Sequence, residues 1–111
     1  MKVDAGLGPQ LERVPELTRE YEELGVDGLR TAETAHDPFL PLLLAAEHSD
    51  RLELITSIAV AFARSPMLLA NVGHDINAYP KGRLTIGLGS QIRPHITKRF
   101  SMPWDLSLIH I

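Results

Sequence analysis

The sequence predicts an α/β fold of about four consecutive βα units. Short apolar runs begin near residues 2, 28, 52 and 84, and each of the first three is followed by a segment whose apolar residues recur at helical spacing. Such regular alternation is typical of a parallel sheet with crossover helices. Because a closed (β/α)₈ barrel needs roughly 200–250 residues, the 111 residues could form a small open sheet or half of a barrel. Periodicity alone leaves both possibilities open.

The first unit consists of a strand over residues 3–7 and a helix opened by Pro9. Gly25 stands where a helix commonly ends in a left-handed residue, so we expect it to be the C-cap. The apolar stripe that predicts this helix comprises Leu11, Val14, Leu17, Tyr21 and Leu24.

The second and third units begin with strands over residues 28–33 and 52–60. After Glu53 the third strand is almost continuously apolar and β-branched, which suits a strand buried on both faces. Asp37-Pro38 and Ser65-Pro66 each combine a capping side chain with a proline, and therefore predict helix starts. The first of these helices ends near His48, and the second stops before Pro80.

The fourth strand covers residues 84–89, and the regular pattern ends after it. Residues 90–104 read as a long basic loop or a short helix, and residues 105–111 show neither a helix start nor a further unit. We therefore expect the chain to stop where a fourth crossover helix should begin.

Composition excludes several classes of function. The hydrophobic share of 44% and the charged share of 23% are ordinary for a globular protein. With a net charge of −3 and scattered basic residues, the chain is not suited to bind nucleic acid or an anionic membrane. Because cysteine is absent, disulfides, thiolate nucleophiles and cysteine-based zinc sites are excluded. No apolar run approaches the ~20 residues of a membrane span and the N-terminus lacks a signal-peptide core, so we expect a cytoplasmic protein.

Candidate site residues are those that follow the strands, because ligands gather at the carboxyl ends of parallel strands. His36 is either an ordinary loop histidine beside the capping Asp37, or a proton donor or acceptor at the mouth of the site. Glu33 is either a satisfied carboxylate at the rim or a polar anchor in the pocket. The segments that meet this criterion are residues 6–8, 33–36, 57–64 and 89–95.

Other motifs are weak. Gly6-Leu7-Gly8 and Gly87-Leu88-Gly89 begin like a dinucleotide-binding fingerprint but lack its third glycine. Gly87 and Gly89 would serve either close backbone packing or a flat ligand lying against the backbone. The five histidines show no metal-binding spacing, and no serine stands in a G-x-S-x-G elbow. The residues therefore predict no metal site and no hydrolase.

Three segments in this order resemble the luciferase-like monooxygenase superfamily, and most of all its coenzyme F420-dependent oxidoreductase class. They are residues 34–42 (TAHDPFLPL), 56–66 (TSIAVAFARSP) and 82–91 (GRLTIGLGSQ). The resemblance covers residues 1–104, which we take as a partial barrel domain, and leaves residues 105–111 as a non-family tail of the kind a truncated coding sequence would carry. It implies the N-terminal half of a (β/α)₈ TIM barrel, and a full-length parent that transfers a hydride between coenzyme F420, or alternatively FMN, and a small organic substrate.

The resemblance also implies a set of site residues. His36 matches the family's catalytic histidine loosely, and we count Glu33 with it as a catalytic candidate. A non-prolyl cis peptide behind the cofactor ring is expected at Ser57–Ile58. The polar contact after the fourth strand falls near Gln91 and His95. The expected cofactor-binding residues are therefore Ser57, Ile58, Gly89, Ser90, Gln91 and His95.

Two other readings remain, and both are weaker. A sugar-phosphate isomerase or aldolase half-barrel would need a lysine or glutamate base at a strand end, and no lysine stands at any of the four. A small non-enzymatic α/β binding domain would have to cover its own sheet edges, and the fourth strand ends without cover. We expect the full-length parent to be a homodimeric enzyme, and the isolated chain to be inactive.

Overall fold

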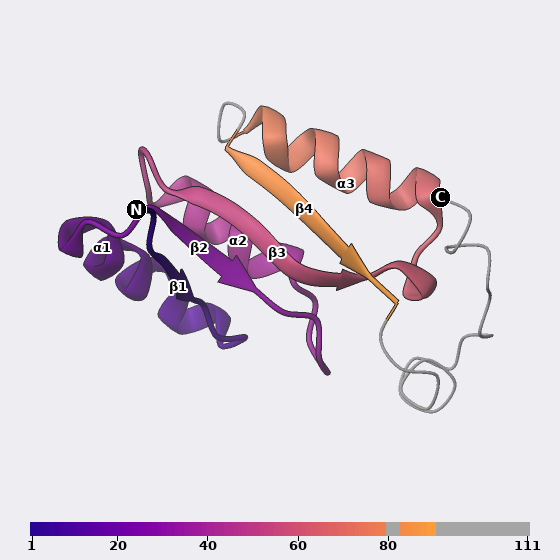
Figure 1. The fold of residues 1–111 in the computed structure, drawn as a ribbon, viewed down its shortest axis with the longest axis horizontal. Helices are drawn as coiled ribbons and strands as arrows, with labels where there is room; N and C mark the ends of the chain where they lie inside the picture. Colours follow the sequence, from indigo (N-terminus) through magenta and orange to yellow (C-terminus); the bar gives the residue numbers. More distant parts are fainter. Residues whose placement is uncertain (80–82, 91–111) are drawn as a thin grey trace.

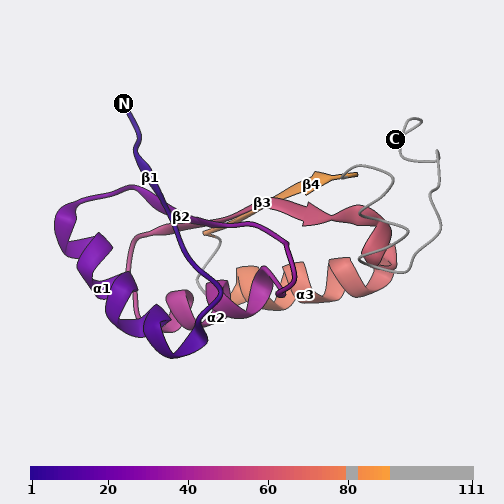
Figure 2. The same ribbon diagram turned by 90° about the horizontal axis from the view of Figure 1, so that it is seen from below.

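The computed structural model describes residues 1–79 and 83–90, which form a parallel sheet in the order β1-β2-β3-β4 (Figure 1). The predicted topology is confirmed, and so is the placement of the helices, because α1, α2 and α3 all lie on one side of the sheet (Figure 2). Short 3-10 helices cover Leu11–Arg13 and Ala61–Ala63. The main elements are β1 (Asp4–Gly6), α1 (Val14–Leu24), β2 (Gly28–Thr31), α2 (Phe39–Glu47), β3 (Glu53–Val60), α3 (Pro66–Ala78) and β4 (Leu84–Gly89).

The helix ends follow the capping residues in the sequence. α1 ends at Gly25, whose φ of 85° is left-handed and therefore suits a residue without a side chain. Ser65 caps α3 by accepting a hydrogen bond from the Leu68 N–H at 3.1 Å, and Pro66 is the first helical residue. α2 begins at Phe39, one residue later than the sequence suggests, so Pro38 stands at the cap position.

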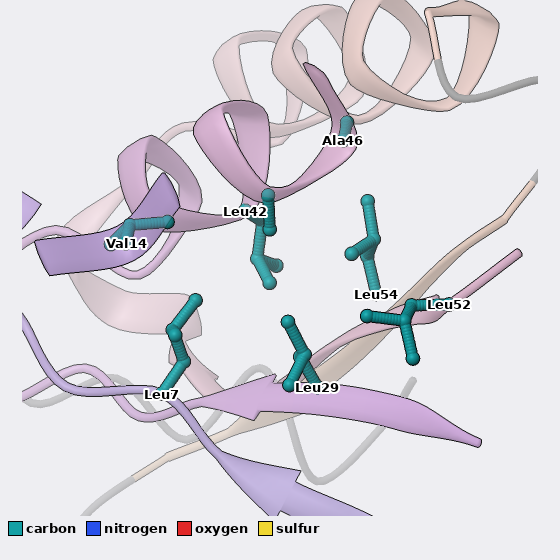
Figure 3. Close-up of a cluster of buried hydrophobic side chains, with 8 residues drawn as sticks. Leu7, Val14, Leu29, Leu42, Ala46, Leu52 and Leu54 are labelled. Carbon is teal, nitrogen blue, oxygen red and sulfur yellow. The ribbon is translucent and has the colours of Figure 1, made fainter. Parts of the chain in front are cut away.

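The main hydrophobic core lies between the sheet and the helices α1 and α2 (Figure 3). One row of paired strand residues, Ala5, Leu29, Leu54 and Leu84, packs in this core. A second, smaller cluster of Phe39, Ala59 and Ile76 lies beside α3. The buried members of the main core are Leu7, Val14, Leu29, Leu42, Ala45, Ala46, Leu52 and Leu54.

The other face of the sheet is bare within the described residues. Side chains alternate between the two faces of a strand, so the next row of paired residues, Gly6, Arg30, Ile55 and Thr85, points away from the helices. The Arg30 side chain is exposed on this face, and it makes no ion pair with any residue of 1–79 or 83–90. Charged residues thus stand on a surface that no described part of the chain covers.

The amino-terminal ends of the strands carry an exposed ion pair. The Lys2 ammonium donates a hydrogen bond to Glu53 Oε1 at 2.9 Å, and this bond raises the pKa of Lys2. Across residues 1–79 and 83–90, every helix is too short or too polar to cross a membrane.

Candidate functional site

The carboxyl ends of the strands bring the sequence-predicted site residues to one edge of the sheet. Glu33 follows β2, Ser57 and Ile58 lie in the second half of β3, and Gly89 ends β4 with the exposed Ser90 directly after it. Two further predicted cofactor contacts, Gln91 and His95, lie outside the described residues, as does the whole of residues 105–111.

β3 contains an irregularity at the predicted place. The Ser57–Ile58 peptide is cis, which confirms the expectation drawn from the resemblance. The pairing with β4 shifts between Thr56 and Ala59: Thr56 pairs with Ile86, and Ala59 pairs with Leu88. Two residues of β3 therefore oppose the single residue Gly87, which is the arrangement of a β-bulge.

The bulge presents two consecutive side chains on the bare face. Thr56 and Ala59, on either side of it, are buried. Ser57 is exposed and Ile58 is half-buried, and the Ile58 side chain lies over the backbone of Gly89. The carboxyl end of the sheet thus presents the half-buried Ile58 over the backbone of Gly89, with the exposed Ser57 next to it in the chain.

A threonine side chain completes the hydrogen bonding at the bulge. The Gly87 N–H donates to Thr56 Oγ1 at 2.9 Å, and the Thr56 hydroxyl donates to the Gly87 carbonyl at 3.0 Å. These two bonds satisfy backbone groups of β4 at the point where the ladder is out of step. Thr56 is therefore part of the site, although the sequence analysis used it only as part of a motif.

Gly87 and Gly89 are required for different reasons. A side-chain carbon at Gly87 would lie 2.5 Å from the carbonyl oxygen of Thr56, which is backbone and has no room to move without separating the strands. A side-chain carbon at Gly89 would lie 1.9 Å from Ile58 Cδ1, the far end of a side chain that can rotate. Of the two explanations considered from the sequence, close packing thus applies to both glycines.

We expect Gly87→Ala to destabilise the chain more than Gly89→Ala. Both substitutions gain the same small benefit, because replacing glycine reduces the entropy of the unfolded chain. The difference between their free energies of unfolding therefore reports the difference in steric conflict. The first should cost about 1–3 kcal/mol of the free energy of unfolding, as overpacked sites do, and the second about 0.5–1.5 kcal/mol for a displaced rotamer. Urea unfolding followed by circular dichroism measures both, and a larger loss for Gly89→Ala would contradict this account of the bulge.

Glu33 is a buried anchor in this structure. Its side chain is 8% exposed, and Oε1 accepts hydrogen bonds from the Val60 N–H at 2.6 Å and from Arg64 Nη1. Its own N–H donates to the Ile58 carbonyl at 3.0 Å. Glu33 therefore joins the end of β2 to the bulge residue Ile58 and to Val60, the last residue of β3, and its part in proton transfer stays a prediction.

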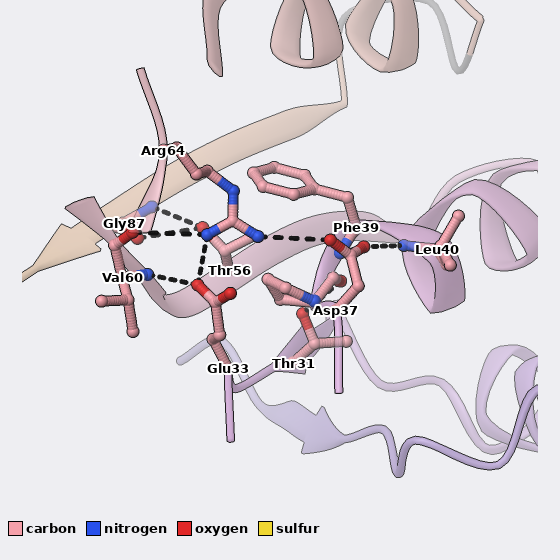
Figure 4. Close-up of polar contacts among 10 residues, drawn as sticks. Thr31, Glu33, Asp37, Phe39, Leu40, Thr56, Val60, Arg64 and Gly87 are labelled. Carbon is pink, nitrogen blue, oxygen red and sulfur yellow. Dashed lines mark hydrogen bonds and ion pairs between the residues drawn. The ribbon is translucent and has the colours of Figure 1, made fainter. Parts of the chain in front are cut away.

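Arg64 is the central cation of the site (Figure 4). Its Nη1 contacts Glu33, its Nη2 lies 3.2 Å from Asp37 Oδ1, and its guanidinium carbon lies 5.2 Å from the centre of the Phe39 ring. The other oxygen of Asp37 accepts the N–H groups of Phe39 and Leu40, both at 2.8 Å, so Asp37 caps α2 as predicted. Two carboxylates and an aromatic ring thus surround one guanidinium that is 15% exposed.

His36 lies in the exposed loop between Glu33 and Asp37. Among the residues that the structure describes, the imidazole has no hydrogen-bond partner. The loop follows β2 at the carboxyl edge of the sheet, and a part for His36 in proton exchange stays a prediction.

Sequence reasoning included Arg64 only as the last residue of the candidate segment 57–64 and gave it no role of its own. The available signal was an arginine just after a buried strand, together with two acidic residues after the neighbouring strand, Glu33 and Asp37. Because neighbouring parallel strands end at the same edge of a sheet, the arginine and the two carboxylates would either form ion pairs there or remain unpaired. The sequence alone did not show which carboxylate would be buried.

The described residues contain two cavities near this edge. One of about 410 Å³ lies between α2 and α3 on the helical side, lined among others by Leu40, Leu43 and Val72. A smaller one of about 150 Å³ lies between the ends of β1 and β2, lined by residues including Leu7 and Thr34. Within 1–79 and 83–90, no group of three or more histidine or acidic side chains is placed to hold a metal ion.

Comparison with known proteins shows close sequence relatives. The family model described as luciferase-like monooxygenase matches residues 2–108. Uncharacterized proteins of Mycobacterium tuberculosis (Rv1360) and Mycobacterium bovis (Mb1395) are each 62% identical to the chain over 104 residues. The match covers 94% of this chain and 31% of each relative, so the chain spans about a third of the length of the curated relatives it matches.

Solved structures show the same fold at lower identity. A monooxygenase, RslO1, from Streptomyces bottropensis superposes with a TM-score of 0.83 at 24% identity, over 98% of this chain and 39% of its own. The coenzyme F420-dependent tetrahydromethanopterin reductase from Methanopyrus kandleri gives 0.80 at 20% identity, over 93% and 30%. The oxygenating constituent of 3,6-diketocamphane monooxygenase from Pseudomonas putida, in complex with FMN, gives 0.79 at 15% identity, over 90% and 32%. The four parallel strands and the three helices between them match the N-terminal part of TIM-barrel enzymes of this type.

Proposed function

The chain belongs to the luciferase-like monooxygenase family, and from this premise we propose that it is part of a flavin- or deazaflavin-dependent oxidoreductase. The full-length protein would transfer a hydride between coenzyme F420, or alternatively FMN, and a small organic substrate. Family membership supports the general kind of chemistry. The cofactor, the substrate class and the residue roles are our proposal.

The surface of Ser57 and Ile58 is the observation that carries this proposal. A flavin or deazaflavin ring is flat, with apolar faces and a hydrogen-bonding edge. The half-buried Ile58 supplies an apolar surface on the bare face, and the exposed Ser57 hydroxyl lies beside it. The residues present therefore fit such a ring: Ser57 and Ile58 would hold it, Gly89 would take part by supporting Ile58 from below, and Ser90, Gln91 and His95 are further proposed contacts.

The bare face of the sheet supports the same assignment. In a closed barrel this face is the interior, and ligands enter at the carboxyl ends of the strands. Both the bulge and the His36 loop stand at that edge, so a ring lying on Ile58 would have the loop beside it.

The residues have separate proposed roles. When bound, the cofactor supplies the hydride chemistry of its ring. His36 would give up or take a proton at one of its ring nitrogens, because an imidazole can serve as either an acid or a base in proton exchange. The Oε1 atom of Glu33 already accepts hydrogen bonds from the Val60 N–H and from Arg64 Nη1. We therefore propose that Glu33 acts on the site through the backbone of Ile58 and Val60.

We place coenzyme F420 first and FMN second. The sequence blocks most resemble the F420-dependent class, and one solved structure of the same fold is F420-dependent by its description. Another was solved in complex with FMN, so the fold accommodates either ring. We further propose a homodimeric full-length protein, as the family resemblance implies. Sedimentation equilibrium on that protein measures its mass.

The expected result for His36→Ala in a full-length protein containing these residues is a fall in kcat of about 10²- to 10⁴-fold, the usual contribution of a general acid or base. The affinity for the cofactor should change little, because the imidazole acts on the substrate. His74→Ala is the matched control, since His74 is exposed in the middle of α3. Steady-state kinetics and fluorescence titration with F420 and with FMN measure both quantities. Equal kcat values for the His36 and His74 variants would remove His36 from the mechanism.

A further inference from the structure

The loop that carries His36 has both of its ends bound to the same guanidinium. Residues 34–36 are exposed, and they are bounded by Glu33 and Asp37. Glu33 contacts Arg64 Nη1, and Asp37 contacts Arg64 Nη2 at 3.2 Å. A planar guanidinium has a fixed fork of donors, so two carboxylates bound to its two ends are held at a set separation.

The same network reaches the bulge in β3. Arg64 Nη1 also donates to the Val60 carbonyl at 3.3 Å, and the Val60 N–H donates to Glu33 at 2.6 Å. The Glu33 N–H donates to the Ile58 carbonyl at 3.0 Å. The guanidinium and the buried carboxylate therefore connect the His36 loop to the strand segment that presents Ile58.

The Phe39 ring restricts where the guanidinium can go. It lies 5.2 Å from the guanidinium carbon and belongs to the buried cluster beside α3. Packing on one side and two carboxylates at the ends leave Arg64 little freedom, in agreement with its exposure of 15%.

We propose that Arg64 is a positioning residue that sets the location of His36 relative to the Ser57–Ile58 surface. The proposal rests on the function proposed above only where it gives a reason for holding His36 in place. Whether Arg64 holds the His36 loop in one conformation can be measured without cofactor or substrate. It assigns Arg64 no contact with the substrate or the cofactor. It implies that a lysine, which offers a single point charge, cannot replace it.

Asp37→Asn is the most selective test. The single side-chain oxygen of asparagine can still cap α2 by accepting the Phe39 N–H. The amide NH₂ group then faces the guanidinium, so the ionic contact with Arg64 is lost. We expect α2 to keep its amide protection while the His36 side chain becomes more mobile. Proton–carbon NMR relaxation of the His36 ring and hydrogen exchange at the Phe39 and Val60 amides give the two readouts.

Arg64→Lys should loosen both ends of the network. Exchange at the Val60 amide is expected to rise about 10- to 100-fold, the effect of losing a hydrogen-bonded charge, together with higher mobility of the His36 ring. Adding ethylguanidinium to the Arg64→Ala variant should return the mobility of the His36 ring, measured by NMR relaxation, to that of the parent chain. Ethylammonium should leave it unchanged. If Arg64→Ala is unfolded, Asp37→Asn still decides the question.

Arg51→Lys is the matched control. Arg51 also bonds backbone carbonyls, those of Val26 and Glu22 at 2.7 and 2.8 Å, but at the opposite end of the sheet. It should leave the His36 ring unchanged. The proposal is overturned if Asp37→Asn and Arg64→Lys leave the His36 ring as ordered as in the parent chain. None of these readouts needs cofactor, so a failure of the proposed function would appear separately, as absent cofactor binding or an active His36→Ala variant.

Discussion

A purified polypeptide of these 111 residues is expected to show no turnover with either cofactor and to bind F420 or FMN more weakly than micromolar. The reason lies on the bare face of the sheet. The row of Gly6, Arg30, Ile55 and Thr85 has no covering layer among the described residues, so Ile55 lacks an apolar partner on that face there, where burial is worth ~25 cal/mol per Å². The chain spans 31% of the length of its relative from Mycobacterium tuberculosis, so a polypeptide of these residues lacks whatever contacts the rest of such a protein makes with a cofactor.

Fluorescence titration of the purified chain with F420 and with FMN measures this affinity, and sedimentation measures whether the chain is monomeric. Within the described residues, β1 and β4 each have one edge without a partner strand, and such edges favour association. A full-length relative of Mycobacterium tuberculosis, 62% identical over the shared region, is the protein for comparison. A monomeric, cooperatively unfolding chain with micromolar affinity for either cofactor would show that these four units suffice for the site.

The order of elements was predictable because the signals are local. Apolar periodicity marks strands and helices, and Gly25 and Ser65 act through their own backbone conformation or a bond three residues away. The helix α2 begins at Phe39, one residue later than predicted, although Asp37 accepts the N–H groups of Phe39 and Leu40 as a cap residue should. A difference of one residue is usual at helix ends. The cis peptide at Ser57–Ile58 came from the family resemblance, since nothing in the neighbouring residue types requires it.

The polar network at the strand ends was not predictable in detail. Glu33 and Arg64 are 31 positions apart in sequence, and whether each is buried depends on how β2 and β3 end relative to one another. The structure shows Glu33 as a satisfied carboxylate, bonded to Val60 and Arg64, and the alternative that it is a polar anchor in the pocket stays a prediction. Thr56 was missed for a similar reason: its hydroxyl bonds Gly87 only because the bulge displaces the ladder of β4.

Leu42→Ala is expected to lower the free energy of unfolding by about 2–5 kcal/mol, as large-to-small changes in a core do. Leu42 lies in α2 and is 0% exposed, in contact with the core that joins the helices to the sheet. Alanine favours helix at least as well as leucine, so the loss reports packing rather than helix propensity. For a domain of ordinary stability, about 5–15 kcal/mol, this is a large part of the total.

The neighbouring Leu43 provides the control for this last prediction. It belongs to the same helix and carries the same side chain, but it is 41% exposed, so Leu43→Ala should cost about 1 kcal/mol or less, as partly exposed positions do. Urea unfolding followed by far-ultraviolet circular dichroism gives both values from chains that differ at adjacent positions. Similar losses for the two variants would mean that α2 does not pack on the sheet through Leu42, and the register of α2 against β2 and β3 would have to be redrawn. Since Asp37 and Phe39 are held at the start of this helix, the same error would displace the Arg64 network and with it the His36 loop.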